Sequence, residues 1–316
     1  MWSRVDAPFL RFPPRRPMSI GARRRLDFYI AISPWLLGIV LFTGAPLLAS
    51  LFISFTNWDI LTPPVWVGLA NYKNLLTADP RFRIALANTA IYSAGSVCIL
   101  TIAPLFVALL LNQKVPLVTW FRTIVYLPAV TSGVVLGILW LWIYNPQFGV
   151  INYFLDLLRI PHVPWLLDPF WAKIALILTN LWQIGPNMLI FLAGLQGVPK
   201  ELYEAASIDG ASSWAKFRYV TVPLLSSTIF FVIIISVINS FQVFTSALVI
   251  TQGGPGTGTL FYTLYMYYRA FLDLRMGYAS AMAWILFVII LLLTLVQFRV
   301  ARRWVYYETG DARDGQ

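Results

Sequence analysis

The chain has 316 residues, of which 59% are hydrophobic and 11% are charged, and its formal net charge is +10. Because soluble domains are roughly 45–50% apolar, this composition argues against an ordinary water-soluble domain and indicates a membrane protein. The basic residues form no single aromatic-rich face, so the positive charge favours attraction to the headgroups of a lipid bilayer and no nucleic-acid partner is expected.

Six apolar runs are long enough to cross a bilayer, which takes about 20 residues per helix. They are 28–54, 84–111, 121–144, 172–195, 224–250 and 277–298. They predict an all-α, multi-pass membrane domain over residues 28–300. A Pro- and Arg-rich tail (1–27) precedes this domain, and a second tail (301–316) follows it. The first run contains prolines and lacks a clear cleavage site, so we expect a retained helix rather than a signal peptide.

The distribution of basic residues predicts the orientation. If both termini are cytoplasmic, sixteen of the 23 Lys and Arg residues lie on the inner side, in agreement with the positive-inside rule. The remaining seven lie on the outer side: Lys73, Arg81, Arg83, Arg159, Lys173, Arg269 and Arg275. Three loops would then face outward, at 55–83, 145–170 and 251–275. In the second, residues Val150 to Leu158 predict a short interfacial helix.

Several kinds of chemistry lack their residues in this chain. No Walker A sequence is present, so ATP binding by a P-loop is not expected. No Asp, Glu, Lys or Arg lies near the middle of a predicted span, although ion-coupled carriers usually need such groups. The one histidine (His162) and the one cysteine (Cys98) belong to no catalytic or metal-binding pattern. We therefore expect no enzyme activity, metal or cofactor, and transport that is either passive or driven by another protein.

A polar segment at 196–223 separates the fourth and fifth spans and predicts two short helices. Glu201 and Glu204 lie near the positive end of the first helix. Gly210 can take positive φ and end it. Ser212 or the next serine can cap the second helix, which we expect from 214 to 222 with Pro223 as its end. An ordinary amphipathic loop between two spans is the alternative.

The residues of this segment carry a family resemblance. Glu204-Ala205-Ala206, Asp209-Gly210-Ala211 and Pro223 resemble the EAA loop of permease subunits of binding-protein-dependent ABC importers. Four further stretches resemble the carbohydrate branch of that family, and in particular the first of its two permease subunits (the maltose-, lactose- and glycerol-3-phosphate-type subunit): Leu69–Tyr72, Asn180–Trp182, Gly185-Pro186 and Thr251–Pro255. The resemblance covers about residues 80–300 and does not extend to the N-terminal tail.

The resemblance implies a type I ABC importer permease fold in the inner or plasma membrane of a prokaryote. It implies as partners a second homologous permease subunit, two cytoplasmic ATPase subunits that hydrolyse ATP, and an extracytoplasmic solute-binding protein that meets the outer loops. The cargo would be a sugar, an oligosaccharide or a related polyol or phosphate ester. Six residues would couple the chain to the ATPase, with the first as charged anchor: Glu204, Ala205, Ala206, Asp209, Gly210 and Pro223.

Polar side chains of the fourth and fifth spans are candidates for the substrate path. Ser236, Asn239 and Ser240 share one helical face, with Gln242 close by. Trp182, Gln183 and Asn187 flank the Gly185-Pro186 bend. Such groups can bind a sugar, but Ser and Asn also join helices to one another in membranes, and both interpretations stay open.

The resemblance favours the sugar path, because maltose-type relatives place their sugar in these two spans. Val243 and Ile184 depart from the aromatic- and Asn-rich pattern of those relatives, so the identity of the sugar does not carry over. A self-contained carrier or channel for small polar solutes is the main rival hypothesis, and it leaves Glu204 to Pro223 without a role. A membrane-embedded enzyme or scaffold would need a catalytic or metal constellation that the sequence does not reveal, or a partner surface with no path for a cargo.

Overall fold

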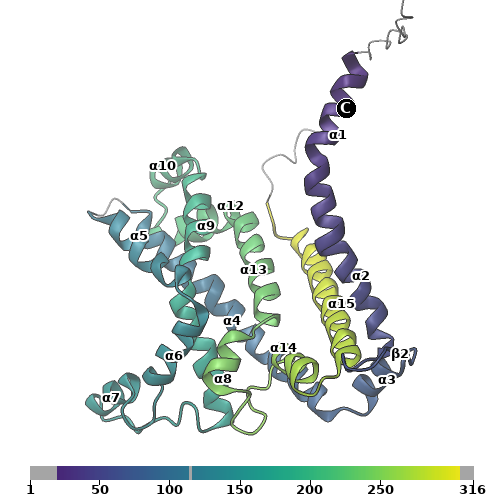
Figure 1. Ribbon diagram of the computed structural model, residues 1–316. Helices are drawn as coiled ribbons and strands as arrows, with labels where there is room; N and C mark the ends of the chain where they lie inside the picture. Colours follow the sequence, from purple (N-terminus) through teal and green to yellow (C-terminus); the bar gives the residue numbers. More distant parts are fainter. Residues whose placement is uncertain (1–19, 114–115, 307–316) are drawn as a thin grey trace, which may run out of the picture. The chain divides into compact units, whose positions relative to one another are not determined.

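The computed structural model describes residues 20–113 and 116–306, and its contacts divide the chain into two units, 1–52 and 53–316. The first unit contains α1 (Ile20–Ile39), a π-helical turn (Val40–Gly44) and most of α2 (Ala45–Ser54), which continue one another as a single helix (Figure 1). Its stretch from Asp27 to Ser54 is long and apolar enough to span a membrane. The helix begins at Ile20, so residues 20–27 are helical although the sequence placed them in a tail. The rest of that predicted tail and residues 307–316 of the second tail lie outside the described residues.

The described residues of the second unit are helical apart from turns, loops and one short strand pair, β1 (Thr56–Asn57) and β2 (Val65–Trp66), in which Thr56 lies opposite Trp66. Its helices are α3 (Ala70–Thr77), α4 (Pro80–Leu111), α5 (Val118–Tyr126), α6 (Gly133–Ile143), α7 (Val150–Leu157), α8 (Pro169–Thr179), α9 (Gly185–Gln196), α10 (Lys200–Ile208), α11 (Ser213–Lys216), α12 (Val222–Leu224), α13 (Ser226–Phe241), α14 (Tyr262–Tyr267) and α15 (Met276–Ala301). The predicted short helix in the second outer loop is present as α7.

The described residues contain three continuous helices long and apolar enough to span a membrane: Asp27–Ser54, α4 and α15. Three further spans are bent pairs of helices: Val118–Val130 with Gly133–Ile143 at 100°, Pro169–Gln183 with Gly185–Gln196 at 50°, and Ser213–Leu224 with Ser226–Phe241 at 67°. When each pair is counted as one span the total is six, and the predicted all-α, six-span fold is confirmed.

The close packing of the α8–α9 bend against α5 requires a glycine. A Cβ on Gly185 would lie 2.7 Å from the Val125 carbonyl oxygen and 2.8 Å from the Tyr126 Cα, both on the backbone of α5. Neither backbone atom can move aside without shifting the helix, so the missing side chain is what allows the two bent spans to approach each other. Pro186 then occupies the first turn of α9, where no backbone N–H is needed.

The second helix of the segment 196–223 does not end at Pro223, as the sequence predicted. It begins at Ser213, runs through a π-helical turn (Phe217–Thr221) into α12, and bends only at Leu225. In the π turn the Val222 N–H bonds to the Phe217 carbonyl, which places Pro223 in the first turn of α12. Proline is tolerated there because its missing N–H would have no partner within the helix.

The third outer loop is also more ordered than the sequence suggested, since it contains α14 and a π-helical turn (Tyr268–Leu272). The side chain of Asn88 on α4 donates hydrogen bonds to the carbonyls of Thr257 and Leu260, at 2.7 and 3.3 Å. The Tyr262 N–H then donates to the Thr89 hydroxyl at 2.8 Å. Two neighbouring residues of α4 thus hold the glycine-rich turn and the start of α14.

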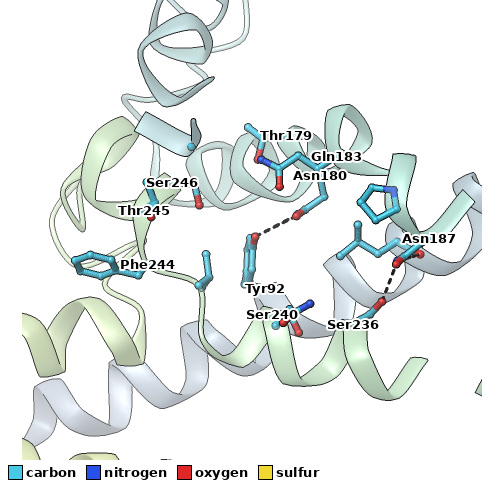
Figure 2. Close-up of a pocket in the computed structure, with 15 residues that line it drawn as sticks. Tyr92, Thr179, Asn180, Gln183, Asn187, Ser236, Ser240, Phe244, Thr245 and Ser246 are labelled. Atoms are coloured by element: carbon cyan, nitrogen blue, oxygen red, sulfur yellow. Dashed lines mark hydrogen bonds between the residues drawn. The ribbon is translucent and has the colours of Figure 1, made fainter. Parts of the chain in front are cut away.

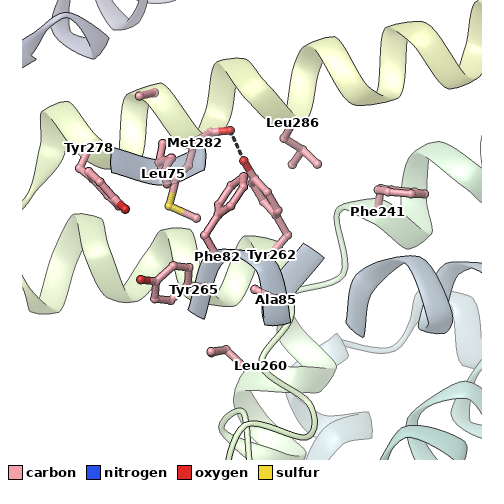
Figure 3. Close-up of a cluster of buried hydrophobic side chains, with 11 residues drawn as sticks. Leu75, Phe82, Ala85, Phe241, Leu260, Tyr262, Tyr265, Tyr278, Met282 and Leu286 are labelled. Atoms are coloured by element: carbon pink, nitrogen blue, oxygen red, sulfur yellow. Dashed lines mark hydrogen bonds between the residues drawn. The ribbon is translucent and has the colours of Figure 1, made fainter. Parts of the chain in front are cut away.

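A cluster of buried side chains joins α3, α4, α13, α14 and α15 (Figure 3). Phe82 and Tyr262 lie edge to face at its centre, with ring centroids 5.6 Å apart, and the Tyr262 hydroxyl donates to the Met282 carbonyl at 2.7 Å. Near this cluster, the Asn71 side-chain amide donates to the carbonyls of Ser54 and Thr56, both at 2.9 Å. The Leu69–Tyr72 stretch therefore has a packing role, which is to hold the end of α2 and β1.

Within the second unit, α10 lies at one end and α3, α7 and α14 lie at the other (Figure 1). These last three helices come from the three predicted outer loops, and α10 comes from the predicted cytoplasmic segment. The three predicted outer loops therefore share one end of the second unit, and the predicted cytoplasmic segment lies at the other (Figure 1).

Candidate functional site

A cavity of about 390 Å³ lies between the bent spans and α4 (Figure 2). Its wall comes from α4, α6, the α8–α9 bend, α13 and residues 243–246 that follow α13. The lining residues are Tyr92, Leu100, Gly133, Thr179, Asn180, Gln183, Pro186, Asn187, Ser236, Asn239, Ser240, Val243, Phe244, Thr245 and Ser246. None of these residues is charged. The cavity therefore offers amides, hydroxyls and two aromatic rings, which is the chemistry that binds neutral polar molecules.

Some of the predicted path residues are used to join helices. The Ser240 hydroxyl is hydrogen-bonded to that of Ser93 on α4. The Asn187 amide donates to the Leu100 carbonyl at 2.8 Å and, at 3.4 Å, to the Ser236 hydroxyl (Figure 2). Ser236 and Ser240 are 1% and 4% exposed. These contacts link α4, α9 and α13, as expected of polar side chains that replace water inside a membrane.

Two predicted path residues are available to a ligand. The side chains of Asn239 and Gln183 are exposed, line the cavity and form no side-chain hydrogen bond within the described part of the chain. Each amide can donate two hydrogen bonds and accept two. Asn239 and Ser240 are neighbours on α13, yet the amide of Asn239 is free, whereas the hydroxyl of Ser240 is buried against α4. The helical stripe predicted from the sequence therefore has two structural roles.

Two further predicted residues lie outside the cavity wall. Trp182 is 46% exposed, and its ring meets Trp140 edge to face with centroids 6.1 Å apart. Gln242 is exposed where α13 ends. Val243, noted in the sequence as a departure from the family pattern, does line the cavity.

Sequence reasoning missed Tyr92, Asn180 and Phe244 as cavity residues. The Asn180 amide and the Tyr92 hydroxyl are hydrogen-bonded at 3.2 Å, and the same amide reaches Ser96 at 3.1 Å. Asn180 belongs to the Asn180–Trp182 stretch that carries the family resemblance. A polar side chain inside a membrane span needs a partner or a wet cavity, and this could have identified Asn180 as a cavity residue. Phe244 is the third residue after α13 and lies outside any helix, so nothing in its local sequence indicated which way its ring points.

The predicted coupling segment is a solvent-exposed pair of short helices. α10 ends before Gly210, whose φ is +74°, and the Ser212 hydroxyl accepts the N–H of Ala215 at 3.2 Å to cap α11. The prediction of a glycine stop and a serine cap is confirmed. The Lys216 ammonium donates to Ser207 at 2.7 Å, which ties the two helices together.

The surface of this segment combines acidic and apolar groups. Glu204 and Asp209 are exposed, and neither forms an ion pair with a described residue. Ile208 and Trp214 are 87% and 68% exposed. Large apolar side chains that stand free beside unpaired carboxylates are typical of a surface that a partner protein covers.

At the opposite end, Asp79 is the centre of a polar network that the sequence did not predict. Its carboxylate accepts the hydroxyls of Tyr265 and Tyr278, both at 2.6 Å, and the N–H of Phe82 at 3.1 Å. An Arg269 guanidinium nitrogen lies 3.9 Å from the same carboxylate. The network joins the beginnings of α4 and α15 to α14.

The charges of this network shift its pKa values. Burial alone would raise the pKa of Asp79, but the two tyrosine hydroxyls, the Phe82 N–H and Arg269 lower it by more, so that it lies below the ordinary value. Burial, together with the hydrogen bond to Asp79, raises the pKa of Tyr265 to about 12. At neutral pH the acid is therefore ionised and this tyrosine keeps its proton.

Among residues 20–113 and 116–306, no group of three or more His, Cys, Asp or Glu side chains is placed to hold a metal ion.

The family described as binding-protein-dependent transport system inner membrane component matches residues 100–306. The probable ABC transporter permease protein YesP of Bacillus subtilis (strain 168) is 42% identical over 287 residues, which are 90% of this chain and 93% of the relative. The lactose transport system permease protein LacF of Rhizobium radiobacter is 34% identical over 299 residues, covering 90% and 99%. The arabinooligosaccharides transport system permease protein AraP of Halalkalibacterium halodurans is 36% identical over 292 residues, covering 91% and 89%.

A chain in the crystal structure of a bacterial alginate ABC transporter in complex with an alginate pentasaccharide-bound periplasmic protein has a similar fold. The TM-score is 0.78 and the identity 24%, and the match covers 90% of this chain and 96% of that one.

Proposed function

This chain belongs to the family of binding-protein-dependent transport system inner membrane components, and we propose that it is the permease subunit that passes an uncharged sugar through an ABC importer. The predicted family and the predicted type I ABC importer permease fold are confirmed by the matches to relatives and to a solved transporter. The observation that carries the proposal is the cavity, which holds free amides and aromatic rings and has no charged side chain.

The chemistry of the cavity supports a neutral cargo over a phosphate ester. Moving an anion into a membrane cavity without a cationic partner costs several kcal/mol at least, whereas a hydroxyl needs only a hydrogen-bond partner. Asn239 and Gln183 supply such partners, and the rings of Tyr92 and Phe244 supply apolar faces on which a sugar can stack. Relatives named for lactose and arabinooligosaccharide transport support the same class of cargo. The volume of about 390 Å³ is within the range of about 300–1,000 Å³ typical of small-molecule sites.

Energy for transport would come from separate ATPase subunits that dock on the coupling segment. In this proposal Glu204 meets a basic residue of the ATPase, while Ile208 and Trp214 enter an apolar cleft. Ala205 and Ala206 allow close approach, and Asp209, Gly210 and Pro223 set the angle between α10 and the helix that continues to Leu224. A push on this helix is transmitted through the bend at Leu225 to α13, which lines the cavity.

The remaining partners and the orientation follow from the same proposal. The chain pairs with a second permease subunit and two ATPase subunits in a prokaryotic inner membrane, with α10 and both termini in the cytoplasm. A sugar-loaded binding protein docks at the opposite end, over α3, α7 and α14. A self-contained carrier or channel is less well supported because it gives the exposed acidic and apolar surface of α10 no function.

The first test is to purify the tagged chain from native membranes and to identify what accompanies it by mass spectrometry. We expect a second permease and a P-loop ATPase, followed by ATP-dependent uptake of neutral sugars in proteoliposomes. Uptake by the isolated chain without ATP would contradict the proposal and favour a passive carrier.

Substitutions test the cavity. We expect Asn239→Ala to reduce uptake about three- to tenfold, the value of one lost hydrogen bond, with assembly unchanged. Gln242→Ala is the matched control, because the same chemical group is removed from a nearby exposed position outside the cavity. If Asn239→Ala instead prevents assembly with the second permease, its role is to join helices and the assignment to the sugar path is wrong.

A further inference from the structure

A second cavity, of about 350 Å³, lies beside α3. This helix is at the end of the second unit away from α10 (Figure 1). It is formed where α3 ends, α4 begins and the turn after α14 leads into α15. Arg81, Arg269 and Arg275 line this outer basic pocket, together with one carboxylate, that of Asp79. It is therefore chemically unlike the uncharged cavity described above.

The carboxylate of the pocket already has three hydrogen-bond donors. Asp79 accepts two tyrosine hydroxyls and one backbone N–H, as described above. Arg269 is the cation nearest to it, and the guanidinium of Arg269 also pairs with Asp273 at 2.8 Å. Three arginines against these two acids leave a net charge of +1 around the pocket, and neither acid forms an ion pair with Arg81 or Arg275.

Arg81 and Arg275 are exposed and, among the described residues, neither forms an ion pair or a side-chain hydrogen bond. The Arg275 guanidinium lies over the ring of Tyr278, 4.7 Å from its centroid. Because the Tyr278 hydroxyl is held by Asp79, the ring is a fixed support for Arg275. The pocket thus presents two free guanidinium groups, one of which is positioned in advance.

We propose that the outer basic pocket receives an aspartate or glutamate side chain of the soluble binding protein. The inference rests on the proposed function, which brings that protein to this end of the chain. A guanidinium can bind a carboxylate through two parallel hydrogen bonds. The same segments also expose Leu76 and Phe271, each 58% exposed, as apolar surface for the partner. The transported sugar is not the occupant of this pocket, because the cavity assigned to the sugar has no charged side chain and therefore suits an uncharged molecule.

The contact would guide docking rather than drive transport. Charges at the rim of an interface mainly accelerate association and fix its register, and their effect weakens as salt is added. In this role the pocket sets the concentration of binding protein that the importer needs, while the maximal rate depends on the coupling segment and the cavity.

The test uses the complete importer in proteoliposomes and its sugar-loaded binding protein as the probe. ATPase stimulation is measured against the concentration of that protein, at low and high salt. For the double variant Arg81→Glu/Arg275→Glu we expect the half-saturating concentration to rise about three- to tenfold at low salt and less at high salt, with the maximal rate unchanged. Lys73→Glu is the control, since it reverses an exposed charge on α3 outside the pocket and should shift the concentration less than about twofold.

A cross-linking measurement identifies the occupant. Arg81→Lys keeps the charge and introduces an amine that carbodiimide can couple to a carboxylate in contact with it. We expect a cross-link from position 81 to an acidic residue of the binding protein, found by mass spectrometry, and none from Lys73.

Three outcomes would overturn the inference or its basis. Equal half-saturating concentrations for the double variant and wild type would refute the role of the pocket and leave the proposed function unaffected. A response of the variant that follows the phosphatidylglycerol content of the vesicles, with binding-protein dependence unchanged, would identify the occupant as a lipid headgroup. If the binding protein does not stimulate even the wild-type importer, the proposed function itself fails.

Discussion

Asp79→Asn preserves the size of the side chain but removes the charge on which Tyr265 and Tyr278 converge. Both hydroxyls donate to the carboxylate at 2.6 Å, and hydrogen bonds to a charged group contribute about 1.5–3 kcal/mol each. The asparagine keeps one carbonyl acceptor, so about one such bond and the attraction to Arg269 are lost. The pair with Arg269 is long, at 3.9 Å, and adds less than about 1 kcal/mol. We expect a loss of about 2–4 kcal/mol in the free energy of unfolding.

The assay is thermal unfolding of the purified importer in detergent, followed by tryptophan fluorescence. At about 2–3 °C per kcal/mol for a chain of this size, Tm should fall by about 5–10 °C. Asp273→Asn is the control, because its carboxylate is exposed and pairs with the same arginine, and its effect should stay below about 1 kcal/mol.

The pH dependence gives a second check on the same network. The pKa of Asp79 is lowered from 3.8 in the folded protein, so its stabilisation is present above that value and is lost as the pH falls through the lower, folded pKa. The difference in Tm between wild type and Asp79→Asn should therefore be constant near neutral pH and narrow below about pH 4. An asparagine variant as stable as wild type, or a difference that does not change with acid, would refute the role given to the charge.

Gly210→Pro should abolish uptake, because proline cannot adopt the φ of +74° at this position. Immunoblots should show that membrane insertion is intact, and normal uptake would refute the coupling role. Glu204→Lys should likewise abolish uptake and release the ATPase subunits in pull-downs, and retained ATPase would show that another residue is the anchor. Gly185→Ala should lower the free energy of unfolding by about 1–3 kcal/mol, since the added Cβ would meet the Val125 carbonyl at 2.7 Å. An unchanged Tm would mean that α5 shifts to accommodate the methyl group at no measurable cost. Ser240→Ala should cost about 1 kcal/mol of stability but leave sugar affinity unchanged, and a loss of affinity would place this hydroxyl on the path.

Features with strong local signals could be predicted from the sequence. The six apolar spans, the short helix at α7 and the glycine stop at Gly210 depend on composition, periodicity and single-residue conformational preferences. The predicted apolar span begins at about 84, and α4 extends beyond it to Pro80. A local signal for this beginning exists: the Asp79 side chain accepts the Phe82 N–H, and Pro80 follows as the first helical residue. An aspartate before a proline is a recognisable helix beginning.

Features that depend on distant parts of the chain could not be predicted. Asp79 meets Tyr265 and Tyr278 across 186 and 199 residues of sequence, so no local pattern identifies the network or the pocket beside it. Pro223 was taken as a helix end because the sequence does not reveal the π-helical turn before it. In the same way, periodicity placed Ser236, Asn239 and Ser240 on one face of a helix, but only the packing of α4 and α9 separates the buried serines from the free amide.

That separation on α13 has a consequence for how such a permease can evolve. The serines that hold the helix in the scaffold are buried against its neighbours, while Asn239, one residue from Ser240, faces the cavity without a partner. A substitution at Asn239 or Gln183 would change the hydrogen bonds offered to a sugar and leave the contacts between α4, α9 and α13 intact. New cargo preferences could then arise by single steps, with no intermediate that has lost its fold.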